Sequence, residues 1–257
     1  MNIHMTQVWT QAERKALLEA ARRQIGQLAR SSPMPRLPLG CAEIDDCLKG
    51  GLTAGALHEV AAADHRASPA AWGFLLALAR VAVSARGGTI VWPLGKRAGD
   101  FGVPYGPGLK AFGIEPSDIL FIRCKTREDA LWVMEEALRI GGIGAVVGAR
   151  GRRMDLTASR RLQLAAENSA TPIFLLRTYK DDAHSAAMTR WRVKPQTAAR
   201  DGLGFFSNPR WHVALERVRG GRPGEWVVEW KHDALCLRLP AGLGGGALPA
   251  RAARSAA

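Results

Sequence analysis

Four short apolar segments alternate with helical patterns through the middle of the chain. They are rich in Val and Ile, which is typical of buried strands. The four segments are residues 55–60, 89–92, 143–147 and 172–176. Because strands that alternate with helices form parallel βα units, the pattern predicts an α/β fold. The expected architecture is a mostly parallel sheet flanked by helices.

Three helices are expected between these strands. The first, residues 69–85, is almost wholly apolar and should be buried against the sheet. The second begins at Thr126, and Asp129 three residues later completes a capping-box pair. The third covers residues 156–168. The faces expected to point inward carry Leu131, Met134 and Leu138 in the second helix, and Leu162, Leu164 and Ala165 in the third.

The pattern changes after Arg177. Basic and apolar residues alternate over 190–194, and strand-like alternation returns at 211–218 and 225–230. The last two stretches are joined by a charged, glycine-rich turn, which is typical of a hairpin. This part of the chain is therefore expected to form an antiparallel C-terminal extension of the parallel sheet. Residues 241–257 are mostly Gly and Ala and are expected to be a disordered tail.

The N-terminal piece has the pattern of one amphipathic helix, roughly residues 6–30, followed by a proline-rich linker. Its apolar stripe includes Leu17, Leu18, Ile25 and Leu28. Such a helix either packs on its own domain or docks on a partner as an apolar ridge, and the sequence leaves both open. The expected domains are thus residues 1–34, a core at 35–240, and the tail at 241–257.

Composition limits the class of protein. A chain of 257 residues with 47% hydrophobic content can bury one substantial core. Lys and Arg outnumber Asp and Glu by 36 to 23, which gives a net charge of +13. This balance indicates acidic partners, nucleic acid first and an acidic protein surface second, unless it only reflects a GC-rich genome. The scattered cysteines and histidines predict no metal site, and the absence of a signal peptide or long apolar run predicts a cytoplasmic protein with no membrane contact.

The segment after the first strand lies where a RecA-type ATPase carries its phosphate loop. A short helical stretch, a glycine turn at Gly50-Gly51 and the strand at 55–60 resemble the entry to such a core. The loop pattern GxxxxGK[ST] surrounds a phosphate with backbone amides, neutralises it with Lys and holds magnesium with the hydroxyl. This chain instead has Ala62, Ala63, Asp64, His65, Arg66, Ala67, Ser68 and Pro69.

Two alignments of this loop are possible, one counted from the strand and one from the glycine turn after the helix. The Gly-Lys-Thr positions then hold either Ala67-Ser68-Pro69 or Ala70-Ala71-Trp72. Ser68 and Pro69 predict an ordinary helix start, with Ser68 as N-cap. Each missing charge-assisted bond to phosphate costs roughly 1.5 to 3 kcal/mol, and Asp64 adds repulsion. Tight nucleotide binding is therefore not expected, although the loop taken alone is equally explained as an alanine-rich connection.

Other positions that ATP hydrolysis needs also lack their usual residues. The second strand ends in Pro93 and Leu94 instead of an acid that activates water, and Gly148 stands where the third should end in a magnesium-binding Asp. The fourth strand continues into Arg177 instead of an amide. We therefore expect no catalytic residues and no cofactor.

The order of these motifs from about residue 35 to 240 resembles the ImuA family, RecA-like proteins of bacterial mutagenesis cassettes. The segments that carry the resemblance are LGCAEIDDCLKGGL, GALHEV, GGTIVWPLG, RWRVKP and RWHVALERVRGGRPGEW. The resemblance implies a role in the SOS response, with ImuB, an inactive polymerase-like adaptor, and an error-prone replicative-type DNA polymerase as partners in copying damaged DNA. It also implies contacts with RecA, whose ATP-binding residues have no counterparts here.

A basic segment follows the third strand at the edge where α/β sheets bind ligands. Its candidate residues for contact with single-stranded DNA or a partner are Arg150, Arg152, Arg153, Arg160 and Arg161. A mobile loop at 150–153 would follow a phosphate backbone without reading sequence, whereas the alternative is an ordinary solvated surface. Consecutive helical residues differ by about 100°, so Arg160 and Arg161 cannot face one partner equally.

Three functions remain open from the sequence. The preferred one is a non-catalytic RecA-like adaptor in error-prone repair. The first alternative is an unusual RecA-type ATPase or recombinase paralogue, in which Arg66 or an arginine from a second subunit replaces the missing lysine. The second is a cell-division inhibitor built on the same degenerate fold. Nucleotide titration separates the first two, and identification of protein partners separates the third.

Overall fold

The computed structural model describes residues 11, 12, 16, 34–95, 104–149, 154–181, 183–198 and 207–240. The chain divides into two units, residues 1–34 and 35–257. In the first unit, Gln11, Ala12 and Ala16 are helical, and the predicted stripe at Leu17, Leu18, Ile25 and Leu28 lies outside the described residues. All the elements named below belong to the second unit.

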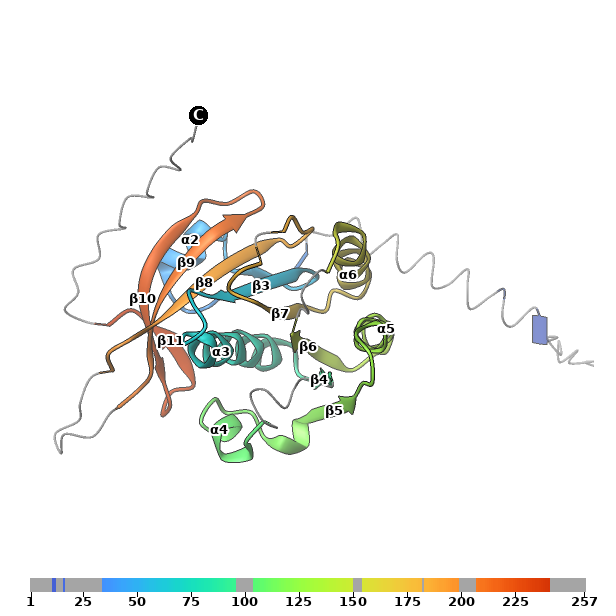
Figure 1. Ribbon diagram of the computed structural model, residues 1–257, viewed down its shortest axis with the longest axis horizontal. Coiled ribbons are helices and arrows are strands. Elements are labelled where there is room, and N and C mark those ends of the chain that lie inside the picture. The colour runs from blue at the N-terminus through green and yellow to red at the C-terminus, as the bar shows by residue number, and fades with distance from the viewer. Residues whose placement is uncertain are drawn as a thin grey trace, which may run out of the picture. The chain divides into compact units, whose positions relative to one another are not determined.

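One mixed sheet contains the parallel strands that the sequence predicts and the extension that follows them. Its strands are β3 (Leu57–Ala62), β4 (Thr89–Leu94), β5 (Ile119–Arg123), β6 (Ile143–Ala149), β7 (Ile173–Arg177), β8 (Thr189–Gln196), β9 (Arg210–Val218), β10 (Gly224–Lys231) and β11 (Cys236–Arg238). They lie in the order β11-β10-β9-β8-β3-β7-β6-β4-β5 (Figure 1). Strands β3 to β8 pair in parallel, whereas β8 to β11 pair antiparallel. The fold is therefore α/β and RecA-like, as predicted.

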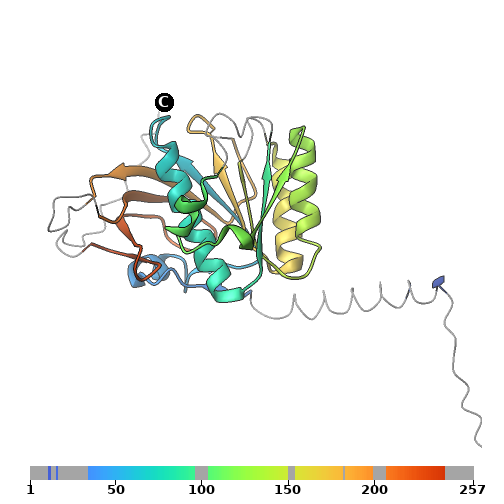
Figure 2. The ribbon, with the colours of Figure 1, turned by 90° about the horizontal axis from the view of Figure 1, so that it is seen from below.

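The remaining elements are short, apart from three long helices. They are β1 (Arg36–Leu37), α2 (Ala42–Cys47), β2 (Leu52–Thr53), α3 (Ser68–Arg86), α4 (Gly106–Lys110), η2 (Pro116–Asp118), α5 (Arg127–Ala137) and α6 (Leu156–Ser169). Strands β1 and β2 form a separate antiparallel pair. Figure 2 shows α3 on one face of the sheet and the pair α5 and α6 on the other. The sheet is thus covered on both faces in its parallel part, which is the usual state of parallel sheets.

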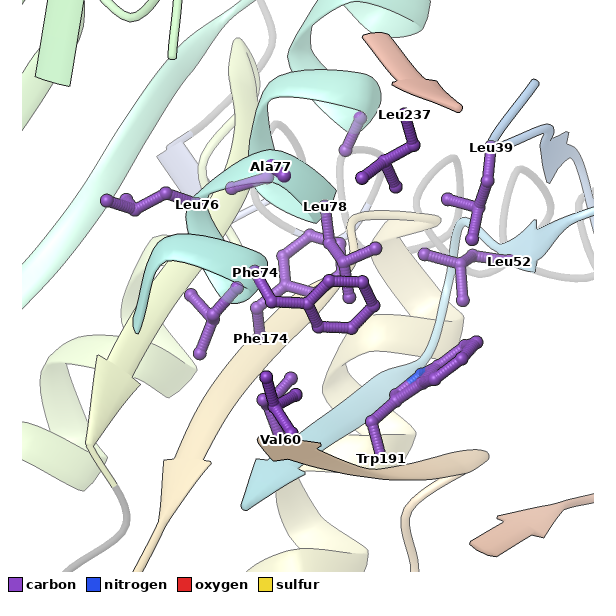
Figure 3. Close-up of a cluster of buried hydrophobic side chains, with 14 of the residues drawn as sticks. Leu39, Leu52, Val60, Phe74, Leu76, Ala77, Leu78, Phe174, Trp191 and Leu237 are labelled. Atoms are coloured by element: carbon purple, nitrogen blue, oxygen red, sulfur yellow. The ribbon is translucent and has the colours of Figure 1, made fainter. Parts of the chain in front are cut away.

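The larger core lies between α3 and the sheet. Phe74 and Leu78 of α3 belong to the same cluster as Val60 of β3, and the Phe74 ring lies edge-on to Trp191 with 5.4 Å between ring centroids (Figure 3). By length and composition α3 would be able to cross a membrane, but half of it is buried inside the fold. The burial of such an apolar helix against strand side chains is the pattern of a core helix.

The antiparallel extension has one apolar and one polar face. Trp191, Val213 and Val228 alternate onto the core side, as period-two strands require. The opposite face carries ion pairs, three between neighbouring strands and one within β10. These pairs are Arg192 with Glu216, Arg210 with Glu229, Lys231 with Glu229, and His212 with Glu225. Arg192, Arg210, Lys231 and His212 each therefore have an acidic neighbour on this face.

A fully buried histidine, His58, lies on β3. Its two ring nitrogens are 2.8 Å from Thr189 Oγ1 and 2.9 Å from the Thr53 carbonyl oxygen, and the ring stacks on Phe174. Burial lowers the His58 pKa to about 4, a hydrogen bond with the Thr53 carbonyl opposes the change, and the charge of Arg36 adds to it. The imidazole is therefore neutral at physiological pH.

The structure corrects three details of the sequence analysis. Strand β8, residues 189–196, pairs in parallel with β3, so the antiparallel part begins at β9. The edge strand β5 was not predicted. Leu164 is 58% exposed instead of buried, because α6 turns Leu162 and Ala166 inward and Leu164 lies almost opposite Leu162 on the helix. By contrast, the capping box at the start of α5 is confirmed.

Candidate functional site

The loop of residues 63–67 lies at the carboxyl end of β3, the central strand of the nine-stranded sheet. Strand β3 is fully buried between β7 and β8, and α3 starts directly after the loop. Ligands of open α/β sheets bind at this edge, and phosphate-binding loops connect a strand to a helix in the same way. The geometry of this loop therefore decides which chemistry the site offers.

Asp64 bonds to the backbone of its own loop. Its Oδ1 accepts a hydrogen bond from the Ala67 amide, with 2.9 Å between the atoms. The next amide, that of Ser68, donates to the His65 carbonyl oxygen at 3.3 Å. In a phosphate loop, such amides donate to the phosphate oxygens. Here the Asp64 carboxylate accepts the hydrogen bond of one of these amides, that of Ala67.

The start of α3 differs by one residue from the prediction. Ala67, and not Ser68, is the N-cap, and α3 begins at Ser68, with Pro69 following it. The prediction that the Ser68 side chain caps the helix is therefore wrong, and Asp64 bonds to the cap residue instead. Pro69 contributes no amide, and Ser68 is only 8% exposed. The first turn consequently has few groups that face a ligand.

The ends of β4 and β6 contain packing residues where an ATPase would have acids. Pro93 and Leu94 end β4, and Gly148 comes one residue before the end of β6. A side chain at Gly148 would overlap the terminal methyl of Met134, which lies on α5. A carboxylate at Gly148 therefore has no room unless Met134 moves.

Arg177, at the end of β7, is fully buried in an ion-pair network that the sequence analysis did not find. Its Nη1 donates to Glu59 Oε2 at 3.0 Å, and the same carboxylate oxygen accepts from Ser185 Oγ at 2.9 Å. Glu59 is the one carboxylate on β3 and is completely buried. Its presence in an apolar strand was the available signal, because a buried acid needs a basic partner.

The same network fixes the segment that joins β7 to β8. Arg177 Nη2 donates to the carbonyl oxygens of Asp181 and Ala183 and lies 3.2 Å from Asp181 Oδ1. Arg190 of β8 approaches Glu59 from the other side, at 3.5 Å. Desolvation lowers the pKa of Arg190, and the nearby charge of Arg177 adds to this. Most of the guanidinium donors of Arg177 are thus directed to groups of the protein itself.

The predicted basic surface is only partly described. Arg150, Arg152 and Arg153 lie outside the described residues. Arg160 and Arg161 are both exposed on α6, and Arg161 forms an ion pair with Glu135 of α5. Among the described residues, no group of three or more His, Cys, Asp or Glu side chains is placed to hold a metal ion. The proposed contact of this surface with DNA stays a prediction.

Comparison with known proteins identifies relatives over most of the chain. No protein-family model matches the chain. Protein ImuA of Caulobacter vibrioides, in strain NA1000 / CB15N and in strain ATCC 19089 / CIP 103742 / CB 15, is 37% identical over 215 residues. The match covers 77% of this chain and 84% of the relative. With this identity over most of both proteins, and with the RecA-like sheet described above, the chain belongs to the ImuA family.

Proposed function

We propose that this chain is a non-catalytic accessory protein of SOS-induced DNA repair and error-prone translesion synthesis. In this role it links an inactive polymerase-like partner, ImuB, and an error-prone replicative-type polymerase to damaged DNA or RecA filaments. It works in the cytoplasm as a binding platform and does not consume nucleotide. Membership of the ImuA family supports a role in the SOS mutagenesis cassette. The loop at residues 63–67 supports the lack of nucleotide turnover.

The observation that carries the proposal is the bond between Asp64 and the Ala67 amide. A triphosphate at the end of β3 would have to displace this carboxylate, and no lysine lies in the loop to compensate. The alternative, an ATPase with a non-standard loop, is favoured only by the exposed Arg66. A guanidinium there would sit beside Asp64, which repels phosphate.

Protein binding is supported by two large apolar side chains on neighbouring helices. Trp132 of α5 is 61% exposed and Leu164 of α6 is 58% exposed. The two helices pack side by side on one face of the sheet (Figure 2). Exposed Trp side chains are frequent anchors of protein interfaces.

The proposal is tested by co-purification of the tagged chain from DNA-damaged cells, with and without nuclease. We expect the polymerase-like partner and the error-prone polymerase to be recovered in both samples, because the contacts are between proteins. Recovery that disappears with nuclease would contradict the adaptor role. Recovery of the division GTPase in place of polymerase components would support a cell-division inhibitor instead.

A further inference from the structure

Two glycine turns that are far apart in the sequence meet at the amino edge of the sheet. The first, Lys49 to Gly51, follows α2, and the second, Arg219 to Arg222, forms the tip of the β9–β10 hairpin. The Arg222 amide donates to the Cys47 carbonyl oxygen at 3.0 Å, so the hairpin tip is held against the end of α2. This edge is opposite the loop at residues 63–67, because β8 and β3 both start here.

The approach of the two turns depends on glycine. A Cβ at Gly221 would overlap the Cys47 carbonyl oxygen at the end of α2. Within the first turn, a Cβ at Gly51 would overlap the Leu37 carbonyl oxygen of β1. A Cβ placed on Gly220 would lie 4.0 Å from Lys49 Nζ. The Lys49 ammonium therefore lies next to the hairpin tip, where Arg219 and Arg222 flank the two glycines in sequence.

Four cations gather at this place, and we call them the amino-edge patch: Arg36, Lys49, Arg219 and Arg222. All four are exposed. Arg36 also braces the first turn, because its Nη1 donates to the Leu48 carbonyl oxygen at 3.2 Å and to Thr53 Oγ1 at 2.9 Å. Its charge thus stays in place beside the turn.

The patch lacks the ion pairs that neutralise the neighbouring sheet face. In the part of the chain that the structure describes, no carboxylate lies within ion-pair distance of Lys49, Arg219 or Arg222, even though Asp46 is exposed on the adjacent α2. Arg192 and Arg210, by contrast, each have a glutamate partner. A concentration of unpaired cations attracts a polyanion.

The backbone at Lys49 adds an independent observation. Lys49 follows the C-cap of α2 and has a φ of 58°, in the left-handed region. Glycine or asparagine usually occupies this position, because a Cβ is strained there. A lysine at a strained position points to a use for its ammonium group.

The chemistry of the patch fits phosphate better than protein. The large exposed apolar residues of the described chain are Tyr105, Leu120, Trp132, Ile140, Leu156 and Leu164, and none belongs to either turn. Protein interfaces are built around such anchors. The planar guanidinium group of arginine can donate two hydrogen bonds to one phosphate group. Single-stranded nucleic acid is usually bound by stacking of its bases on aromatic side chains, and the patch has no exposed aromatic ring for this.

We propose that the amino-edge patch binds the phosphate backbone of double-stranded DNA without reading its sequence. Duplex DNA carries one charge per about 1.7 Å of axis, the densest target for such a patch. This inference rests on the proposed function, because that function brings the chain to damaged DNA. It assigns the contact to residues separate from the phosphate-loop position and from the predicted basic surface on α6.

The test compares two variants with equal charge loss, Arg219→Gln with Arg222→Gln and Lys125→Gln with Lys194→Gln. The second pair is exposed elsewhere on the described surface. Binding of a fluorescent duplex of mixed sequence is followed by anisotropy over a series of salt concentrations. We expect the slope of log K against log salt to fall by about 1.8 in the hairpin variant and to change little in the control. Unfolding curves establish that both variants are folded.

An unchanged slope in the hairpin variant, or an equal fall in the control, would overturn the proposal. Normal duplex binding by the hairpin variant together with a loss of binding to polyglutamate would also overturn it, since the patch would then serve an acidic protein. Recovery of cassette proteins after nuclease treatment is measured on the same variants. Normal recovery of the cassette proteins together with an unchanged slope would refute DNA binding by the patch and would leave the proposed adaptor role unaffected.

Discussion

Replacing Glu59 with alanine is expected to lower the free energy of unfolding by about 3 to 5 kcal/mol, the usual cost of breaking a buried ion pair. The carboxylate is completely buried and accepts from Arg177 at 3.0 Å and from Ser185 at 2.9 Å. Without it, Arg177 and Arg190 remain as two buried or half-buried cations with less compensating charge. Urea unfolding followed by tryptophan fluorescence measures the loss.

A matched control comes from the exposed face of the same sheet. Glu216→Ala removes the partner of Arg192, a pair in which both side chains are about one third exposed, and should cost at most about 1 kcal/mol. Replacing both members of the closest pair by apolar residues, Glu59→Leu with Arg177→Met, should restore part of the stability, because Arg177 is then no longer a buried cation without its partner. If Glu59→Ala were as mild as Glu216→Ala, the network would not be the structural element described above.

Stability should also fall between pH 6.5 and pH 4 because of His58. Its pKa is near 6.5 in the unfolded chain and about 4 in the folded protein, so the unfolded state binds more protons in this range. The contribution of the neutral His58 side chain to the free energy of unfolding is complete above pH 6.5 and is lost as the pH falls toward 4. From pH 7.5 to pH 5 the loss amounts to about 2 kcal/mol for this group. The cause is burial of the imidazole, which opposes its charged form.

The measurement compares urea unfolding of the protein and of His58→Gln at several pH values. Glutamine has a donor and an acceptor for the Thr53 carbonyl and Thr189, but it does not titrate. Its stability should depend on pH less steeply above pH 5, where few carboxylates are protonated. Parallel curves for the two proteins would show that His58 is not buried in its neutral form.

Most elements of the fold can be predicted from local sequence patterns. Strand β3, the helix after it and the capping box of Thr126 with Asp129 depend on neighbouring residues, and the sequence predicts them. Strand β5 was missed, because its apolar run is short and lies at the edge of the sheet. The prediction that Leu164 points inward was wrong, because an apolar residue is not necessarily on the inner face of a helix.

The features around the candidate site depend on contacts between distant residues. Glu59 meets Arg177 118 positions later in the chain, and the Cys47 carbonyl at the end of α2 accepts from the Arg222 amide in the β9–β10 hairpin tip. No periodicity or spacing predicts such contacts. The missing lysine, by contrast, is visible in the sequence, but the occupation of the Ala67 amide by Asp64 is visible only in the structure.

The proposed accessory role depends most directly on whether the bend between β3 and α3 binds a triphosphate. Isothermal titration of the chain with ATP and Mg²⁺ answers this, with Arg66→Ala as the comparison. The predicted result is no saturable binding up to about millimolar ATP, which corresponds to an affinity weaker than about −4 kcal/mol. Micromolar binding that Arg66→Ala abolishes would contradict it and would support an ATPase with arginine in place of lysine.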